Sequence, residues 1–334
     1  MTEAGDLHIR PATEGDLPAI LSLMAASLGV GTLDRSEAVW RWKHLNNPFG
    51  RSPVLVALDC ERIVGLRAFM RWTWTAGGRE VPAVRAVDTA THPDYQGRGI
   101  FKKLTLQLLS DLERDETARF VFNTPNSKSK PGYLKMGWRE VARFPVAIRP
   151  RPWRMLRAVR GGGGLKPTLQ ASDTPGLSAE RLAGALERVP SPADRLHTRR
   201  TLDYLRWRYA DVPGLDYAID AETIGEAGAV VVSRLNTMRG MTELRVCEYL
   251  HTPDAEGRKL ARRLLRDRLR RQPHDFASMM PSLVGTGPNI HRGFVTVPRS
   301  GLTLTARPIG QALPSPDPLR PDSWTLSTGD VELF

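Results

Sequence analysis

The sequence has little cysteine and no long apolar run. Its two cysteines, Cys60 and Cys247, lie in opposite halves of the 334 residues without a CxxC or Cys/His spacing. Neither a disulfide framework nor a structural zinc site is therefore predicted. No uninterrupted run of about 18 apolar residues is present, so we expect no membrane-spanning helix and no membrane partner. Residues 1–10 carry Glu3 and Asp6 and no apolar signal core. We therefore expect no Sec export and a cytoplasmic location.

Acidic side chains are in the minority. Lys and Arg number 48 against 36 Asp and Glu, which gives a formal charge of +12, and 40 of the 48 are arginine. This excess suggests an anionic partner, although a coding bias toward arginine in a GC-rich genome explains it equally well. Finger, ribonucleoprotein and basic-zipper signatures are missing, so nucleic acid is not the expected partner. The seven histidines show no metal-ligand spacing, and no nucleophilic triad is visible in the sequence.

The length and apolar content predict two hydrophobic cores. A chain of 334 residues, 41% of them hydrophobic, exceeds the size at which a single core usually stops growing. Alternation and helical spacing predict strands at 7–10, 54–58, 63–74, 81–91, 119–123 and 139–148, and helices at 17–28 and 100–114. This order predicts an α+β unit with a mainly antiparallel sheet over residues 1–148. Pro, Gly and Arg clusters at 149–176 predict a connector.

The second half repeats the first. Residues 85–109 match residues 245–269 at a constant offset of 160, which pairs Arg85 with Arg245 and Pro93 with Pro253. A second repeat matches the Arg-Trp-Lys triplet at 41–43 with Arg-Trp-Arg at 206–208. One offset sustained over a strand, a loop and a helix predicts that residues 177–334 form a second copy of the same fold.

A glycine loop joins a predicted strand to a predicted helix. Gln96-Gly97-Arg98-Gly99 leads directly into the helix that begins at Ile100. Successive backbone N–H groups at a helix N-terminus favour a phosphate or pyrophosphate, and glycines let the main chain approach it closely. A plain turn before a helix would use the same residues, so the loop alone leaves both interpretations open.

Two motifs together resemble the GNAT superfamily of acyl-CoA transferases. The first is the loop above, preceded by Thr91-His92-Pro93-Asp94-Tyr95, which is similar to the family's Arg/Gln-Gly-x-Gly-Ile form. The second is Asn126 followed seven residues later by Tyr133 and then by Gly137-Trp138, similar to the family's Asn-x6-Tyr-x-x-x-Gly-Phe/Trp element. The resemblance covers residues 7–148 strongly and the second half weakly, through the duplication.

The resemblance implies a fold and a set of site residues. It implies two tandem GNAT-like domains, with a catalytic domain at 1–148 and a degenerate one at 177–334. Ala90 and Thr91 would offer backbone groups to the pantetheine arm, Asn126 would contact its thiol end, and Tyr133 would be the general acid for the leaving thiolate. The pyrophosphate would lie on the backbone amides of Gln96, Gly97, Arg98, Gly99 and Ile100. No metal is implied.

An amine acceptor needs a proton acceptor, because an alkylammonium with a pKa near 10 is mostly protonated at neutral pH. Asp88, on the strand that carries Ala90, is the first candidate for this base, with water relaying the proton. Glu80 and His92 are weaker candidates. A C-terminal carboxylate, as in the similar enhanced-intracellular-survival-type acetyltransferases, is a further alternative.

The predicted activity is direct N-acyl transfer from acetyl-CoA, or another acyl-CoA, to a primary amine of a small molecule such as an amino sugar or natural product. One alternative is long-acyl transfer from acyl-CoA or an acidic acyl carrier protein to an amine or a peptide N-terminus. Another is a non-catalytic protein that binds acyl-CoA. The basic segment 258–271 fits either an ordinary solvated helix face or a dock for such a carrier protein.

Two further expectations concern the second copy and the tryptophans. In the second copy Gln96 is replaced by Glu256 and Gly99 by Lys259, so we expect that this copy does not bind CoA. Trp72 and Trp74 alternate on one strand and fit either the core or an acceptor pocket; we expect the core.

Overall fold

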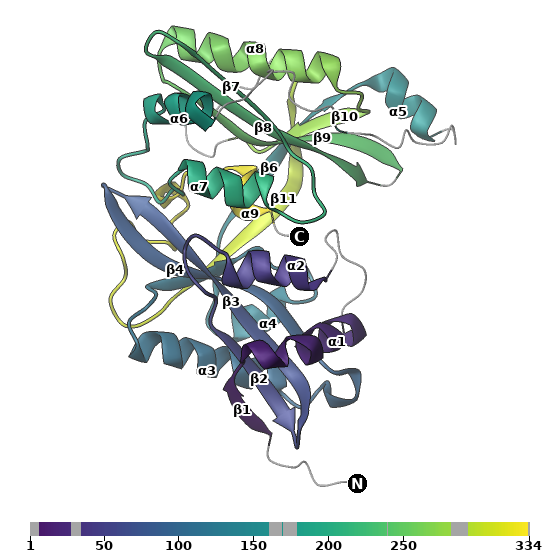
Figure 1. Ribbon diagram of the computed structural model, residues 1–334, viewed down its shortest axis with the longest axis vertical. Coiled ribbons are helices and arrows are strands. Elements are labelled where there is room, and N and C mark those ends of the chain that lie inside the picture. Colours follow the sequence, from purple (N-terminus) through teal and green to yellow (C-terminus); the bar gives the residue numbers. More distant parts are fainter. Residues whose placement is uncertain are drawn as a thin grey trace.

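The computed structural model describes residues 7–27, 35–159, 169, 179–238, 240–281 and 293–332. Two halves lie one above the other along the long axis, and a single sheet runs through both (Figure 1). The sheet has 11 strands in the order β1-β2-β3-β4-β5-β11-β6-β10-β9-β8-β7. Within the described ranges, no helix is long and apolar enough to cross a membrane.

The first half follows the predicted order of elements. Its strands are β1 (His8–Pro11), β2 (Val54–Asp59), β3 (Arg62–Ala76), β4 (Arg79–Thr91), β5 (Phe120–Asn123) and β6 (Arg139–Pro150). Its helices are α1 (Leu17–Ser27), α2 (Glu37–Trp40), α3 (Ile100–Arg114) and α4 (Lys130–Lys135), with short turns η1 (Glu14–Asp16), η2 (Arg41–Leu45) and η3 (Pro93–Tyr95). The mixed, mainly antiparallel sheet confirms the predicted α+β class.

The described part of the second half repeats most of this order, from its first helix onward. Its strands are β7 (Ala218–Ile224), β8 (Ala227–Met238), β9 (Met241–His251), β10 (Phe276–Met279) and β11 (Val295–Pro308). Its helices are α6 (Ala179–Arg188), α7 (Leu202–Leu205) and α8 (Ala255–Arg271), with the π-helical turn η4 (Arg206–Ala210) where the first half has the π-helical turn η2. Helix α5 (Pro152–Val159) follows β6, and η5 (Pro321–Ser323) and α9 (Thr328–Val331) follow β11.

Helices cover both faces of the first half's sheet. Leucines at 104, 108, 109 and 112 recur at helical spacing, and their burial fixes α3 against one face. Helix α1 buries Ile20, Leu23 and Met24 against the other face. The sheet of the first half is therefore covered on both faces.

The last strand of each half pairs with the sheet of the other half. Strand β11 is antiparallel to β5, with Pro308 opposite Phe120, and β6 is antiparallel to β10, with Pro150 opposite Phe276. Strands β11 and β6 also pair with each other. The predicted domain boundary after residue 148 falls inside β6, and the predicted connector 149–176 includes the end of β6 and α5. The two halves are thus parts of one sheet and not independent units.

Tryptophans join the two halves into one core. Trp42 and Trp207 stack with ring centroids 5.2 Å apart, and each indole N–H donates to the other residue's carbonyl, at 2.7 and 2.9 Å. Trp72 and Trp74 are 2% and 0% exposed and belong to the same cluster. The core interpretation of Trp72 and Trp74 is therefore confirmed.

Candidate active site

The loop between β4 and α3 leaves backbone N–H groups free at the start of a helix. Gly97 and Gly99 have φ angles of 77° and 76°, in the left-handed region that favours glycine. A Cβ built on either glycine meets no atom within 4 Å beyond its chain neighbours, so the space over the loop is open. Among the described residues, the N–H groups of Gly97, Arg98 and Gly99 have no backbone acceptor. With the positive end of the 15-residue helix α3 beside it, this loop fits a pyrophosphate.

The corresponding helix end in the second half is closed. The Asp254 carboxylate accepts a hydrogen bond from the backbone N–H of Gly257 at 2.8 Å, so α8 is capped by its own chain. Thr252 lies so close to Gly257 that no Cβ would fit there. Glu256 and Lys259 pair with each other at 3.4 Å. This geometry supports the expectation that the second copy does not hold CoA.

Strands β4 and β5 separate before the open loop, and we call the gap between them the fork. They pair in parallel only where residues 83–85 face residues 120–122. Beyond that point β4 pairs with β3 alone, with Ala90 opposite Leu66 and Thr91 opposite Gly65. Among the described strands, none therefore neighbours the edge of β4 that carries Ala90 and Thr91 on the β5 side, and an extended ligand arm could hydrogen-bond there.

Tyr133 lies on α4, and its ring packs against α3. Its side chain is 4% exposed, and its ring packs against Phe101 and Trp138 with centroids 5.5 and 5.1 Å away. The Arg67 guanidinium carbon stands 5.4 Å from the Tyr133 ring centroid. The hydroxyl has no hydrogen-bond partner among the described residues. The hydroxyl therefore remains free to bond to a ligand.

Asn126 begins the turn that leads into α4. Its Oδ1 accepts from the backbone N–H of Lys128 at 3.0 Å and of Ser129 at 2.9 Å. The side-chain oxygen is therefore engaged in ordering this turn. The amide nitrogen of the exposed side chain is the group left for the predicted contact with the pantetheine arm.

The Asp88 carboxylate is bound by two residues of the π-helical turn η2. It lies in a register shift of β4 and accepts from Lys43 Nζ at 3.0 Å and from His44 Nε2 at 2.8 Å. On the other side of the imidazole, Nδ1 lies 2.9 Å from Ser52 Oγ. An ionised carboxylate only accepts, so His44 Nε2 carries the hydrogen and Nδ1 accepts from the Ser52 hydroxyl. Ser52, His44 and Asp88 thus form a hydrogen-bonded chain.

The surroundings fix the charges in this chain. Burial alone would raise the pKa of Asp88, but the Lys43 ammonium and the hydrogen bond from His44 outweigh it and hold that pKa well below its usual range. Burial lowers the pKa of His44, against the opposing effect of Asp88. At neutral pH, Asp88 is therefore ionised and His44 is neutral. Asp88 is ill suited to take a proton itself, whereas a neutral imidazole can accept one.

Sequence reasoning selected Asp88 but missed the residues around it. Lys43 and His44 lie 45 and 44 positions before Asp88 and come from a π-helical turn, which no simple periodicity predicts. The repeated Arg-Trp-Lys triplet was the one available signal, because it ends at Lys43. The counterparts of Lys43 and His44 in that repeat are Arg208 and Tyr209.

The second half carries a related arrangement without the serine and histidine. Tyr209 OH donates at 2.7 Å to Glu248, which lies 160 positions after Asp88. A strand carboxylate bound to the π-helical turn is thus common to both halves. The His44–Ser52 hydrogen bond lies in the half with the open glycine loop.

The other candidates for the base lie elsewhere. Glu80 is exposed at the β3–β4 hairpin, opposite Thr75. His92 caps the turn η3 by accepting from the Asp94 N–H at 3.3 Å. At the C-terminal end Glu332 is buried and ion-paired with Arg234 at 2.5 Å. Residues 333 and 334, which carry the C-terminal carboxylate, lie outside the described residues.

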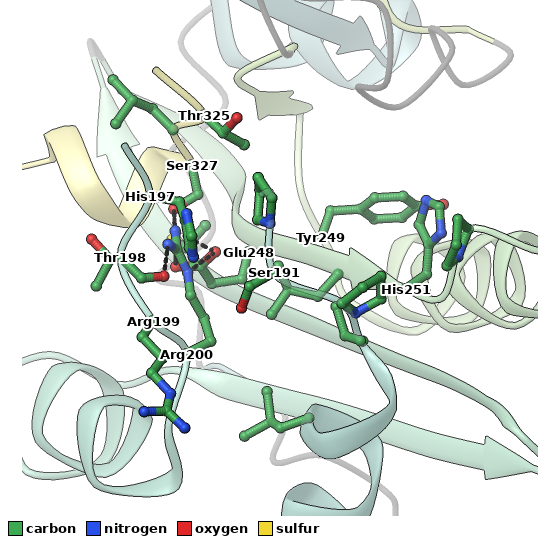
Figure 2. Close-up of a pocket in the computed structure, with 18 of the residues that line it drawn as sticks. Ser191, His197, Thr198, Arg199, Arg200, Glu248, Tyr249, His251, Thr325 and Ser327 are labelled. Carbon is green, nitrogen blue, oxygen red and sulfur yellow. Dashed lines mark hydrogen bonds and ion pairs between the residues drawn. The ribbon is translucent and has the colours of Figure 1, made fainter. Parts of the chain in front are cut away.

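A cavity of about 1430 Å³ lies in the second half. It is bounded by the end of β9, the first turns of α8 and the segment 183–202 (Figure 2). None of the predicted site residues lines it. This cavity is therefore separate from the loop, fork and hydrogen-bonded chain of the first half.

Comparison with known proteins identifies the first half. The family model described as an acetyltransferase (GNAT) domain matches residues 8–141. Residues 8–141 form a GNAT domain. This membership confirms the resemblance drawn from the two motifs, and it supports acyl transfer as the general activity of the GNAT domain. No curated protein matches the chain.

Solved structures share the fold over nearly the whole chain. A GCN5-related N-acetyltransferase from Anabaena variabilis aligns with a TM-score of 0.58 and 13% identity, covering 91% of this chain and 73% of that one. A probable N-acyltransferase from Enterococcus faecalis gives 0.64 and 12%, covering 91% and 72%. Eis1 from Mycobacterium abscessus gives 0.55 and 16%, covering 91% and 74%. At these identities the likeness shows the fold, and it includes both the GNAT domain and the second half.

Proposed function

We propose that this protein transfers an acyl group, first of all acetyl, from acyl-CoA directly to a primary amine of a small molecule. The observation that carries the proposal is the contrast between the two helix ends: the loop at Gly97 and Gly99 is open, whereas Asp254 closes its counterpart. The donor would lie on the loop, with its pantetheine arm along Ala90 and Thr91 and near Asn126. A small-molecule amine such as an amino sugar remains the proposed acceptor class.

Proton transfer in this proposal uses residues on both sides of the fork. As the amine nitrogen bonds to the acyl carbon and the carbon–sulfur bond breaks, the amine loses a proton and the thiolate gains one. We assign the first transfer to Ser52 and His44, with Asp88 holding the imidazole in the tautomer that can accept. Tyr133 donates to the leaving sulfur and is the proposed general acid. Lys43 keeps Asp88 ionised.

Release of free thiol from acetyl-CoA in the presence of primary amines tests the proposal. Wild type should release thiol only when an amine is added, and mass spectrometry should find the N-acetyl product. Tyr133→Phe should lower kcat by about 100-fold, the lower end of what a general acid contributes, with the Kd for acetyl-CoA unchanged.

The same assays give the results that would contradict the proposal, and they also determine the acyl group of the donor. A loss of less than tenfold in Tyr133→Phe would exclude Tyr133 as the acid. Acetyl-CoA binding without transfer to any amine would favour the non-catalytic alternative. Octanoyl-CoA in the same assay separates acetyl from long-acyl transfer.

A further inference from the structure

The cavity in the second half has two chemically different ends. One end holds His197, Ser327 and the Arg200–Glu248 ion pair, and the other approaches α8 with Tyr249 and His251 (Figure 2). Its volume of about 1430 Å³ is larger than that of a typical small-molecule pocket. Apolar side chains from α6, β9, β10 and the residue after β10 also line the cavity: Leu186, Leu250, Met279 and Met280.

His197 offers an unused hydrogen-bond acceptor at the first end. Its Nδ1 lies 2.9 Å from the carbonyl oxygen of Arg195, so Nδ1 must carry the hydrogen and Nε2 the lone pair. Burial lowers the pKa of His197, which keeps the ring neutral. The residue is 4% exposed, and its Nε2 is buried and has no hydrogen-bond partner among the described residues. An acceptor left in this state costs free energy that an O–H or N–H donor of a ligand would recover.

The charged groups near His197 are paired with one another. The Arg200 guanidinium pairs with Asp330 at 2.6 Å and with Glu248 at 3.2 Å. Ser327 Oγ lies 2.9 Å from Glu248. Arg199, which is exposed, also lines the cavity next to Arg200. The charge of Arg200 is thus compensated at this end, and among the described lining residues His197 is the one with a buried polar atom that has no partner.

The other end is cationic. Arg258 and Arg262 project from the first turns of α8, are exposed and line the cavity. In the part of the chain that the structure describes, neither has an ion-pair partner, and Arg258 donates to the carbonyl oxygen of Pro253. Two exposed carboxylates, Glu187 and Asp194, also line the cavity but come from α6 and the loop after it. The end at α8 therefore favours an anion.

The anion is not the pyrophosphate of CoA. The N–H groups at the start of α8 are capped by Asp254, and Thr252 fills the space next to Gly257. A ligand must use the arginine side chains instead of the helix end. We propose that this cavity binds an amphipathic small molecule that carries a phosphate or carboxylate at one end, an apolar body, and a hydroxyl or N–H donor at the other.

Calorimetric titration with three matched probes tests the proposal on the full chain. The probes are 8-hydroxyoctyl phosphate, octyl phosphate, which lacks the hydroxyl, and 1,8-octanediol, which lacks the anion. The first should bind most tightly, with each of the others at least tenfold weaker. A saturating concentration of acetyl-CoA should leave all three affinities unchanged.

Variants assign the two ends. Arg258→Gln/Arg262→Gln should weaken the binding of both phosphate probes at least tenfold and leave the affinity for the diol unchanged. His197→Phe keeps an aromatic ring but removes the acceptor for the hydroxyl. The variant should therefore bind 8-hydroxyoctyl phosphate no more tightly than octyl phosphate. The control Arg266→Gln/Arg270→Gln removes two exposed arginines of α8 that do not line the cavity, and it should change nothing.

Several outcomes would overturn the proposal. These are equal affinities for the three probes, no heat at millimolar 8-hydroxyoctyl phosphate, displacement of that probe by acetyl-CoA, or an equal effect of the control variant. If His197→Phe unfolds the chain, the arginine variant and the probe series still decide the result.

Discussion

At the scale of single residues, the chain Ser52–His44–Asp88 makes a prediction about pH. Replacing His44 by Gln removes the proton acceptor, so the variant can use only amine that is already deprotonated. Its rate should be about 100-fold lower at pH 7 and should rise roughly tenfold per pH unit until the amine's pKa is reached. Wild type should show a much flatter profile. Tyr209→Phe removes the corresponding hydrogen bond in the second half and should leave the profile unchanged. Parallel profiles for wild type and His44→Gln would contradict the assignment.

Asp88 makes a separate prediction about stability. Lys43 is 5% exposed, and Asp88→Asn leaves its ammonium without a counter-charge. Loss of one partner of a buried pair costs about 3 kcal/mol, so urea unfolding at pH 7 should show a decrease of that order. Asp94→Asn, at an exposed position, is the control.

The stability contributed by Asp88 depends on pH in one direction. The folded pKa of Asp88 lies below its unfolded value near 4, so its contribution is present above about pH 4 and is lost as the pH falls through the folded pKa. The difference between wild type and Asp88→Asn should therefore shrink below pH 4. A difference that stayed constant between pH 7 and pH 3 would contradict the ionised pair.

Residues in contiguous motifs are easier to select from the sequence than residues that come together only in the folded chain. Gly97, Gly99 and Tyr133 were found because a loop next to a helix and a motif of fixed spacing are contiguous in the chain. His44 and Ser52 meet Asp88 through a π-helical turn and a strand bulge. Neither feature leaves a periodic signal, so this part of the site required the structure.

At the scale of elements, α3 and α8 are equivalent helices of the two copies, but their N-termini differ: the first is open and the second is capped by Asp254. Asp254→Ala should lower Tm because it removes the cap of α8, whereas Asp254→Asn, which can still accept from Gly257, should not. Neither variant should create a second acyl-CoA site, because Thr252 still crowds Gly257. Thermal unfolding and calorimetric stoichiometry measure both effects. Two equivalents of acetyl-CoA bound by Asp254→Ala would show that the cap alone closes the second copy.

The helix α8 also shows how far a charge pattern can be interpreted. Its run of arginines predicts a solvated face, and most of them are exposed. Arg268 is 1% exposed and pairs with Asp220 at 2.7 Å in the interior. A sequence pattern cannot single out this residue, since its partner lies on β7.

At the scale of the whole molecule, the exchanged strands make the halves depend on each other. A chain of residues 1–159 would lack β11, leaving β5 and β6 with unpaired edges, and would lack Trp207 opposite Trp42. We expect it to aggregate or to unfold without cooperativity by circular dichroism. A monomeric, cooperative fragment that binds acetyl-CoA would contradict this dependence.

The duplication was predictable from sequence, whereas the exchange was not. The constant offset of 160 gives the second copy directly. Strands β6 and β11 are the last strands of the two halves, and each of them pairs with the other half, which the offset does not indicate. The pairing across halves comes together with the contact of Trp42 and Trp207, which also joins residues far apart in the sequence.

The measurement that tests the central claim most directly is calorimetric titration of acetyl-CoA into wild type, Gly99→Glu and Lys259→Glu. Gly99→Glu places a carboxylate in the open loop of the GNAT domain, and Lys259→Glu adds one at the corresponding position of the second half. The account predicts one equivalent bound by wild type and by Lys259→Glu, and no binding by Gly99→Glu. Unchanged binding by Gly99→Glu, or loss of binding in Lys259→Glu, would contradict it.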